Sequence, residues 1–390
     1  MPGFLLSGRC SMTVINIRMK HYLNLLILST IFSCIEPNSE NLWKLNEVVH
    51  IETEGYCRDV YISGDSVFAA AGQGGVQLWD IGTITAPKLL WKKSLAELGV
   101  NKEITQVTYV SSIKQLFALE SNERPLHIDL SSGDTVSVQG QFSGEQTKEF
   151  RVLINDANSF ITVYAADFDD GLKLSTFEYD TGFDLWFYTP GDLITSFGNP
   201  NGIDMYENEI VLTLDQLGIE AFHSENGIIT SSYQIDLEGN ARAVTMLNGS
   251  EFYVACEDAG AFKLATGFSA QSEGKIPFAN DLFVTHIAVN NNQLALSCAS
   301  NGLALYEPDG NTAISARGIH DIGYVYHAEF SGGYLFAATR EGLQIFEIDG
   351  NATISTRGIH DIGYVYHAEF SGNYLFAATR EGLQIFEIDE

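Results

Sequence analysis

The sequence predicts an all-β protein that folds as a single closed β-propeller of eight four-stranded blades, with seven blades as the alternative. Three observations support this prediction: a C-terminal tandem repeat, a recurring three-strand pattern and complementary chain ends. Residues 311–350 are repeated as residues 351–390 with five differences in forty positions. A period of about forty residues is typical of propellers and solenoids, whose units bury a core only by stacking on their neighbours.

Each copy of the repeat contains three short runs of aromatic and β-branched residues, YVYHAEF, YLFAAT and GLQIFEI, separated by turn residues. Such runs are typical of antiparallel strands. The pattern recurs in weaker form upstream, and the first strands of the units begin near residues 58, 105, 150, 201, 242, 285, 324 and 364. The propeller therefore occupies residues 43–390.

The two ends of this region complement each other. The last unit stops at Glu390, directly after its third strand, whereas WKLNEVVHI (Trp43–Ile51) reads as a lone strand with no hairpin partner. We expect the N-terminal strand to complete the last blade, because closing the ring removes an open sheet edge that would otherwise invite aggregation.

The composition restricts the classes of function. The chain is 45% hydrophobic and carries a formal net charge of −29. So acidic a surface repels phosphate backbones, which argues against nucleic-acid binding. Cys57, Cys256 and Cys298 are too scattered for a disulfide framework or a metal quartet, and we expect buried free thiols. No cofactor motif is present, and we expect a monomer.

The N-terminus resembles a bacterial lipoprotein signal peptide over residues 19–34. Lys20 and His21 form a polar start, Leu23–Ile31 an apolar segment, and Cys34 the expected lipidation site. Met19 is then the start of translation and residues 1–18 a mis-called extension, while residues 35–42 form a polar tether. An uncleaved apolar tail is the alternative. The signal predicts a cell-envelope location, with the protein lipid-anchored at the outer membrane or cell surface.

Two segments of each repeat are candidates for binding. We expect RGIHDIGY to form the loop that enters the first strand and TREG the turn between the second and third strands, so that both lie on one face of the ring. Polar and aromatic side chains at the mouth of a rigid ring suit ligand binding. The competing interpretation is that His and Asp cap turns and Arg pairs with Glu. The predicted ligand-binding residues are Arg317, His320, Asp321, Tyr324, His327, Arg340, Arg357, His360, Asp361, Tyr364, His367 and Arg380.

Histidines early in three first strands raise a second hypothesis. His327 and His367 occupy equivalent positions, and His286 aligns with them if one turn residue is skipped. Three imidazoles at a channel mouth could bind a metal. This would suit a metal-assisted hydrolase or lactonase, although the sequence favours a binding module and predicts no metal site outright.

Several units resemble the LVIVD repeat. The segments that carry the resemblance are GGVQLWDIGTITAPKLL (Gly74–Leu90), GLALYEPDG (Gly302–Gly310) and GLQIFEID (Gly342–Asp349), in which a tight turn leads into an apolar strand that ends in an acidic residue. The resemblance implies a bacterial or archaeal cell-surface β-propeller without an established activity. We therefore expect a lipid-anchored envelope module that binds or scaffolds another envelope protein or a glycan.

Overall fold

The computed structural model describes residues 45–132, 136–142, 144–155, 157–265, 276–290, 293–308, 314–320, 322–331, 333–340, 342–348 and 354–388. The chain divides into two compact units, Met1–Leu42 and Trp43–Glu390. The predicted extension, signal peptide, Cys34 and tether belong to the first unit and lie outside the described residues. Within the described ranges, no helix is both long and apolar enough to cross a membrane.

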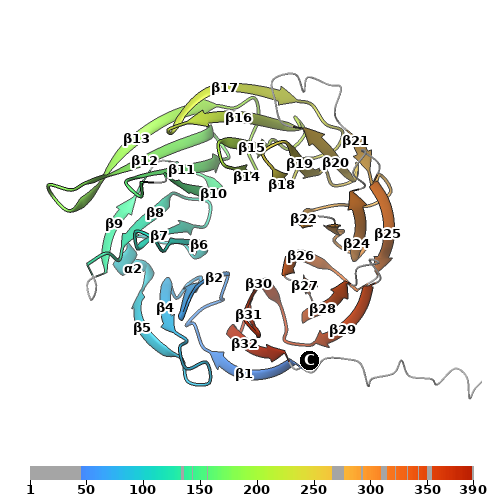
Figure 1. Cartoon of the computed structure of the whole chain (residues 1–390), viewed down its shortest axis with the longest axis horizontal. Helices are drawn as coiled ribbons and strands as arrows, with labels where there is room; N and C mark the ends of the chain where they lie inside the picture. Colours follow the sequence, from blue (N-terminus) through green and yellow to red (C-terminus); the bar gives the residue numbers. More distant parts are fainter. Residues whose placement is uncertain are drawn as a thin grey trace, which may run out of the picture. The chain divides into compact units, whose positions relative to one another are not determined.

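The described strands form eight four-stranded antiparallel sheets, which are the blades of a ring (Figure 1). Seven blades use four consecutive strands, and the eighth combines β30–β32 with β1. The prediction of an all-β propeller with eight blades is therefore confirmed. The described residues include one short helix, α2 (Leu95–Leu98), which lies between blades 1 and 2 and is capped by Ser94 and Glu97.

Blades 1 to 4 consist of β2 (Asp59–Ser63), β3 (Ser66–Ala70), β4 (Val76–Asp80) and β5 (Lys88–Lys93); β6 (Ile104–Val110), β7 (Gln115–Glu120), β8 (Pro125–Asp129) and β9 (Ser137–Gln141); β10 (Thr147–Ile154), β11 (Phe160–Asp167), β12 (Gly171–Asp180) and β13 (Leu185–Thr195); and β14 (Gly202–Tyr206), β15 (Glu209–Thr213), β16 (Ile219–Glu225) and β17 (Ile228–Ile235).

Blades 5 to 8 consist of β18 (Ala243–Asn248), β19 (Glu251–Ala255), β20 (Ala261–Ala265) and β21 (Ile276–Phe278); β22 (His286–Asn290), β23 (Gln293–Ser297), β24 (Leu303–Pro308) and β25 (Ile314–His320); β26 (Val325–Ser331), β27 (Tyr334–Thr339), β28 (Gly342–Ile348) and β29 (Ile354–His360); and β30 (Val365–Ser371), β31 (Tyr374–Thr379), β32 (Gly382–Ile388) and β1 (Leu45–Ile51).

The middle strands carry the core. Almost every residue of β3, β7 and β31 is buried, because both faces of a blade pack against neighbouring blades. Outer strands such as β17 instead alternate between exposed and half-buried residues. The apolar clusters consequently lie between blades, and one of them joins Val60 and Val67 of blade 1 to Phe376 and Leu383 of blade 8.

The N-terminal strand closes the ring as predicted. β1 pairs antiparallel with β32, so that Leu45 lies opposite Ile388 and Ile51 opposite Leu383. Gly382, the first residue of β32, has a φ of 123°, and a Cβ there would lie 2.3 Å from the Ile51 carbonyl oxygen. Only glycine tolerates this approach, which explains why the repeated GLQIFEI run begins with it.

The predicted entry loops are shorter than expected. Arg317 and His320 lie in the outer strand β25, and Arg357 and His360 lie in β29, so the assignment of RGIHDIGY to a loop was wrong in its first half. Arg317 coincides with a β-bulge in the pairing of β24 with β25. An outer strand needs no continuous apolar pattern, because one edge and much of its face are exposed. The described residues between the strands are then Ile322–Tyr324 and, in the second copy, Asp361–Tyr364.

The three described cysteines are free and buried, as predicted. Burial raises the pKa of the Cys298 thiol to about 12, and it raises the pKa of Cys57 as well. Both thiols therefore stay protonated at neutral pH and serve as small apolar groups in the core.

Candidate functional site

A β-bulge at the start of the inner strands places two consecutive side chains away from the core. In β26, Val325 pairs with Thr339 and His327 pairs with Ala338, which leaves Tyr326 as the extra residue. Val325 and Ala328 are buried in the core, while Tyr326 and His327 are half-buried. β30 repeats this arrangement with Tyr366 and His367. The bulge thus brings a tyrosine and a histidine from each of two blades to the centre of the ring.

Five tyrosines form a continuous row across blades 7, 8 and 1, on the face where the chain enters the inner strands (the entry face). Neighbouring ring centroids are 4.7 Å apart between Tyr324 and Tyr326, 4.6 Å between Tyr326 and Tyr364, and 4.7 Å between Tyr364 and Tyr366. Tyr56 continues this tyrosine row at 6.3 Å from Tyr366. The two terminal rings are the most accessible, since Tyr324 is 37% exposed and Tyr56 is 46% exposed.

Two arginines lie against the tyrosine row. The Arg58 guanidinium is 4.3 Å from the centroid of Tyr366, and that of Arg380 is 4.3 Å from the centroid of Tyr364. Arg58 is neutralised by Glu103, whose carboxylate accepts two of its donors at 2.8 and 3.1 Å. Arg380 donates through Nε to the Tyr366 hydroxyl at 3.3 Å, and no described carboxylate lies within ion-pair distance of it. Its positive charge is therefore available to a ligand.

Three histidines on the inner strands β22, β26 and β30 pack against one another at tilted or edge-on angles (the histidine cluster). The His286 and His327 ring centroids are 4.3 Å apart, and those of His327 and His367 are 5.5 Å apart. Burial lowers the pKa of His286 to about 4 and holds that of His327 well below its usual value. Burial acts in the same direction on His367, but hydrogen bonds and charge from Asp59 and Glu329 outweigh it and raise that pKa well above the usual value. In the histidine cluster, His286 and His327 are therefore neutral and His367 is an imidazolium.

Two carboxylates lie within ion-pair distance of His367. Asp59 Oδ1 lies 3.0 Å from His367 Nδ1, and Glu329 Oε2 lies 3.5 Å from Nε2. Glu369, on the same strand as His367, has its pKa raised to about 7, chiefly by burial, with Glu329 and Asp59 adding repulsion that His367 partly offsets. The positive charge of His367 thus interacts with three carboxyl groups, those of Asp59, Glu329 and Glu369.

Around the channel, polar side chains link successive inner strands. Asp59 accepts the backbone N–H of Val107 at 2.9 Å, and Asp204 accepts that of Met246 at 2.8 Å. Arg151 bridges Glu149 at 2.7 Å and Asp204 at 3.1 Å. Glu149 also accepts the backbone N–H of Ile203 in blade 4 at 3.2 Å. Each of the three acids therefore holds one blade to the next, which is a structural role.

These side chains line a cavity of about 360 Å³ in the centre of the ring. Its polar walls come from Glu149, Arg151, Asp204, His286, His327, Glu329 and His367. The three histidines meet here, as the sequence predicted. In the described part of the chain, however, no group of three histidine, cysteine or acidic side chains is arranged to hold a metal ion.

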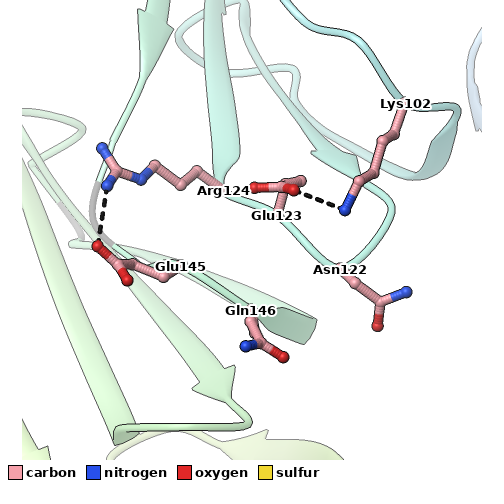
Figure 2. A pocket seen from close by; sticks show the side chains of 6 residues that line it. All are labelled: Lys102, Asn122, Glu123, Arg124, Glu145 and Gln146. Atoms are coloured by element: carbon pink, nitrogen blue, oxygen red, sulfur yellow. Dashed lines mark hydrogen bonds and ion pairs between the residues drawn. The ribbon is translucent and has the colours of Figure 1, made fainter.

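A second cavity, of about 450 Å³, lies on blades 2 and 3 (Figure 2). Its charged side chains pair with one another: Lys102 contacts Glu123 at 2.6 Å, and Arg124 contacts Glu145 at 3.2 Å. Asn122 and Gln146 complete the lining. With its cations already neutralised, this cavity offers no net charge to a ligand.

The predicted ligand-binding residues separate into four groups. Tyr324, Tyr364 and Arg380 belong to the tyrosine row or touch it, whereas His327 and His367 belong to the histidine cluster. Arg340 and Asp361 are exposed on the entry face. Asp321 and the side chains of Arg317, His320, Arg357 and His360 lie outside the described residues. Tyr326, Tyr366, Tyr56 and Arg58 were not predicted, although the YVY alternation could have indicated the first two.

No protein-family model matches the chain, and no curated protein matches its sequence. Solved structures share its fold. Sqt1 from Saccharomyces cerevisiae superposes with a TM-score of 0.63 at 13% identity, covering 90% of this chain and 99% of its own. Sqt1 from Chaetomium thermophilum gives 0.65 at 12% identity, covering 86% and 97%, and the computationally designed Ika8 protein gives 0.62 at 12%, covering 88% and 99%. At these identities the likeness establishes the β-propeller fold alone.

Proposed function

We propose that the protein is a binding module whose partner docks on the tyrosine row. The observation that carries this proposal is a continuous surface of five rings from three blades, beside an arginine with no described carboxylate partner. Tyrosine and arginine are the side chains that contribute most at protein interfaces. The five tyrosine rings of the row are already packed against one another, so their side chains lose little conformational entropy when a partner binds.

The partner we favour is a protein segment with a carboxylate for Arg380. The other class that the sequence suggested, a glycan stacked on the tyrosine rings, makes less use of a guanidinium fork. The alternative of a metal-assisted hydrolase would draw on His286, His327 and His367. It is disfavoured because the nearby carboxylates of Asp59 and Asp204 already accept backbone N–H groups. Divalent-metal binding that is lost on replacing any one of the three histidines would favour it.

Replacing Tyr324 and Tyr364 together with alanine should weaken partner binding by about tenfold or more, a loss common for hot-spot aromatic residues. Thermal stability should change little, since truncating an exposed ring costs well under about 1 kcal/mol and a half-buried ring somewhat more. Quantitative pulldown from the native envelope measures binding, and calorimetry measures stability.

Tyr206→Ala is the matched control, because Tyr206 is 41% exposed at the opposite end of an inner strand. Partner recovery that falls equally in the control, or not at all in the double variant, would contradict a site on the tyrosine row. Treating the envelope with protease or glycosidase before the pulldown separates protein from glycan partners.

We also propose an envelope location through a lipid on Cys34, together with membership of the LVIVD-repeat family. The location is supported by the sequence of residues 19–34, and the family by the repeat segments Gly74–Leu90, Gly302–Gly310 and Gly342–Asp349. β1 begins opposite the end of β32, on the face away from the tyrosine row. An anchor ahead of β1 would therefore turn the row away from the membrane. Mass spectrometry of the mature N-terminus should find a lipidated Cys34, and an unmodified residue 1 or 19 would refute the anchor.

A further inference from the structure

Blade 3 carries the hairpin with the longest strands in the part of the chain that the structure describes. β12 and β13 are 10 and 11 residues long, and their far ends extend beyond the ring (Figure 1). The turn between them is ordered by side chains: Asp180 Oδ1 accepts the N–H groups of Gly182 at 2.7 Å and Phe183 at 3.2 Å, and the Tyr179 hydroxyl donates to Asp184. Side-chain hydrogen bonds therefore hold the tip of the hairpin in a defined conformation.

Apolar side chains at this tip are exposed to solvent. Phe183 is 71% exposed, Leu185 49% and Phe187 47%. The Phe183 and Phe187 rings pack edge to face at 5.9 Å, so they form one patch. By contrast, the outer strand β5 of blade 1 protects its exposed leucines with three lysines, and β13 contains no lysine or arginine. A contiguous exposed patch of this kind marks an interaction surface.

A cavity of about 360 Å³ adjoins the patch and indicates the chemistry of the occupant. It is lined by Glu178, Tyr179, Asp180, Thr181 and Phe187. Glu178 pairs with Phe187 across the two strands, so it shares one face of the hairpin with that ring and with Asp180. No basic residue lines the cavity, and Glu178 has no ion-pair partner among the described residues. Aromatic faces and carboxylates together favour a cationic side chain.

We propose that the tip of the β12–β13 hairpin binds a partner-protein segment in which a lysine or arginine is flanked by apolar residues. The cation enters the cavity between Glu178 and the Phe187 ring, and the apolar neighbours cover Phe183 and Leu185. The negative charge of the hairpin and of the whole chain disfavours the two other possible occupants, a second copy of the chain and an anionic lipid surface. A second copy of this chain would bring the same acids together, and an anionic lipid surface would be repelled by the net charge of −29.

The test uses the full chain and a displayed library of random 12-residue peptides, depleted beforehand on the Phe183→Ser/Phe187→Ser variant. Enriched peptides should contain lysine or arginine beside aromatic or aliphatic residues. Their affinity should fall by about tenfold or more on Glu178→Gln, which removes a charge without changing size. Phe197→Ser is the matched control, because Phe197 is 67% exposed but lies beyond the hairpin. Unchanged melting temperatures confirm that the variants fold.

Three results would overturn this proposal. They are enrichment of peptides without a cation, concentration-dependent dimerisation abolished by Phe183→Ser, and binding to phosphatidylglycerol vesicles abolished by the same change. The hairpin lies on blade 3 and the tyrosine row on blades 7, 8 and 1. Peptide binding should therefore survive the replacement of Tyr324 and Tyr364, so the two proposals fail or succeed separately.

Discussion

A chain that lacks residues 351–390 should fold as a closed seven-bladed ring. The deletion removes β29 and β30–β32, and it leaves β28 as the last strand. β28 and β32 share the sequence GLQIFEI, so β1 meets the same side chains when it pairs with β28. Blade 7 also presents Phe336, Ala338, Leu343 and Ile345 to blade 1 in place of the equivalent Phe376, Ala378, Leu383 and Ile385.

Sedimentation should show a soluble monomer, and limited proteolysis should leave the ring intact. The matched control deletes residues 202–241, a stretch of the same length that contains blade 4 and has no identical neighbour to replace it. That control should aggregate, because the new contact between blades 3 and 5 lacks complementary packing. If the 351–390 deletion also aggregates, the curvature of the ring is set for eight blades.

The sequence predicted the ring because its evidence is periodic. Two nearly identical copies defined one blade, and the unpaired strand before residue 52 predicted closure, which the pairing of Leu45 with Ile388 confirms. The histidine cluster was also predictable, since His286, His327 and His367 occupy equivalent positions in successive inner strands. Because each repeat unit folds in the same way, residues at equivalent positions in the sequence occupy equivalent positions in neighbouring blades.

Features that depend on irregular geometry were not predicted. The bulge at Tyr326 brings a tyrosine and a histidine to the same side, which simple alternation forbids. The outer strands β25 and β29 were read as loops because their residues are not continuously apolar. β13 was missed because it contains Pro190 and Gly191, which usually mark turns but are tolerated on an edge strand.

Replacing Ile51 with aspartate should open the ring. Ile51 is 4% exposed and packs in the cluster that joins blades 8 and 1, opposite Leu383. A carboxylate placed there has no cationic partner among the residues of that cluster, so the expected loss of unfolding free energy is roughly 3–5 kcal/mol. Glu47→Gln, on the exposed part of the same strand, is the control and should change stability by less than about 0.5 kcal/mol.

Amide hydrogen exchange across β1 and β32 tests ring closure most directly. In the wild-type chain, a closed ring requires slow exchange of the β1 amides that hydrogen-bond to β32, while the β1 amides on the outer edge of the blade exchange faster. In Ile51→Asp, both strands should lose protection together while β2–β4 keep theirs longer. Fast exchange of residues 45–51 beside a protected β32 in the wild-type chain would contradict the closed eight-bladed ring.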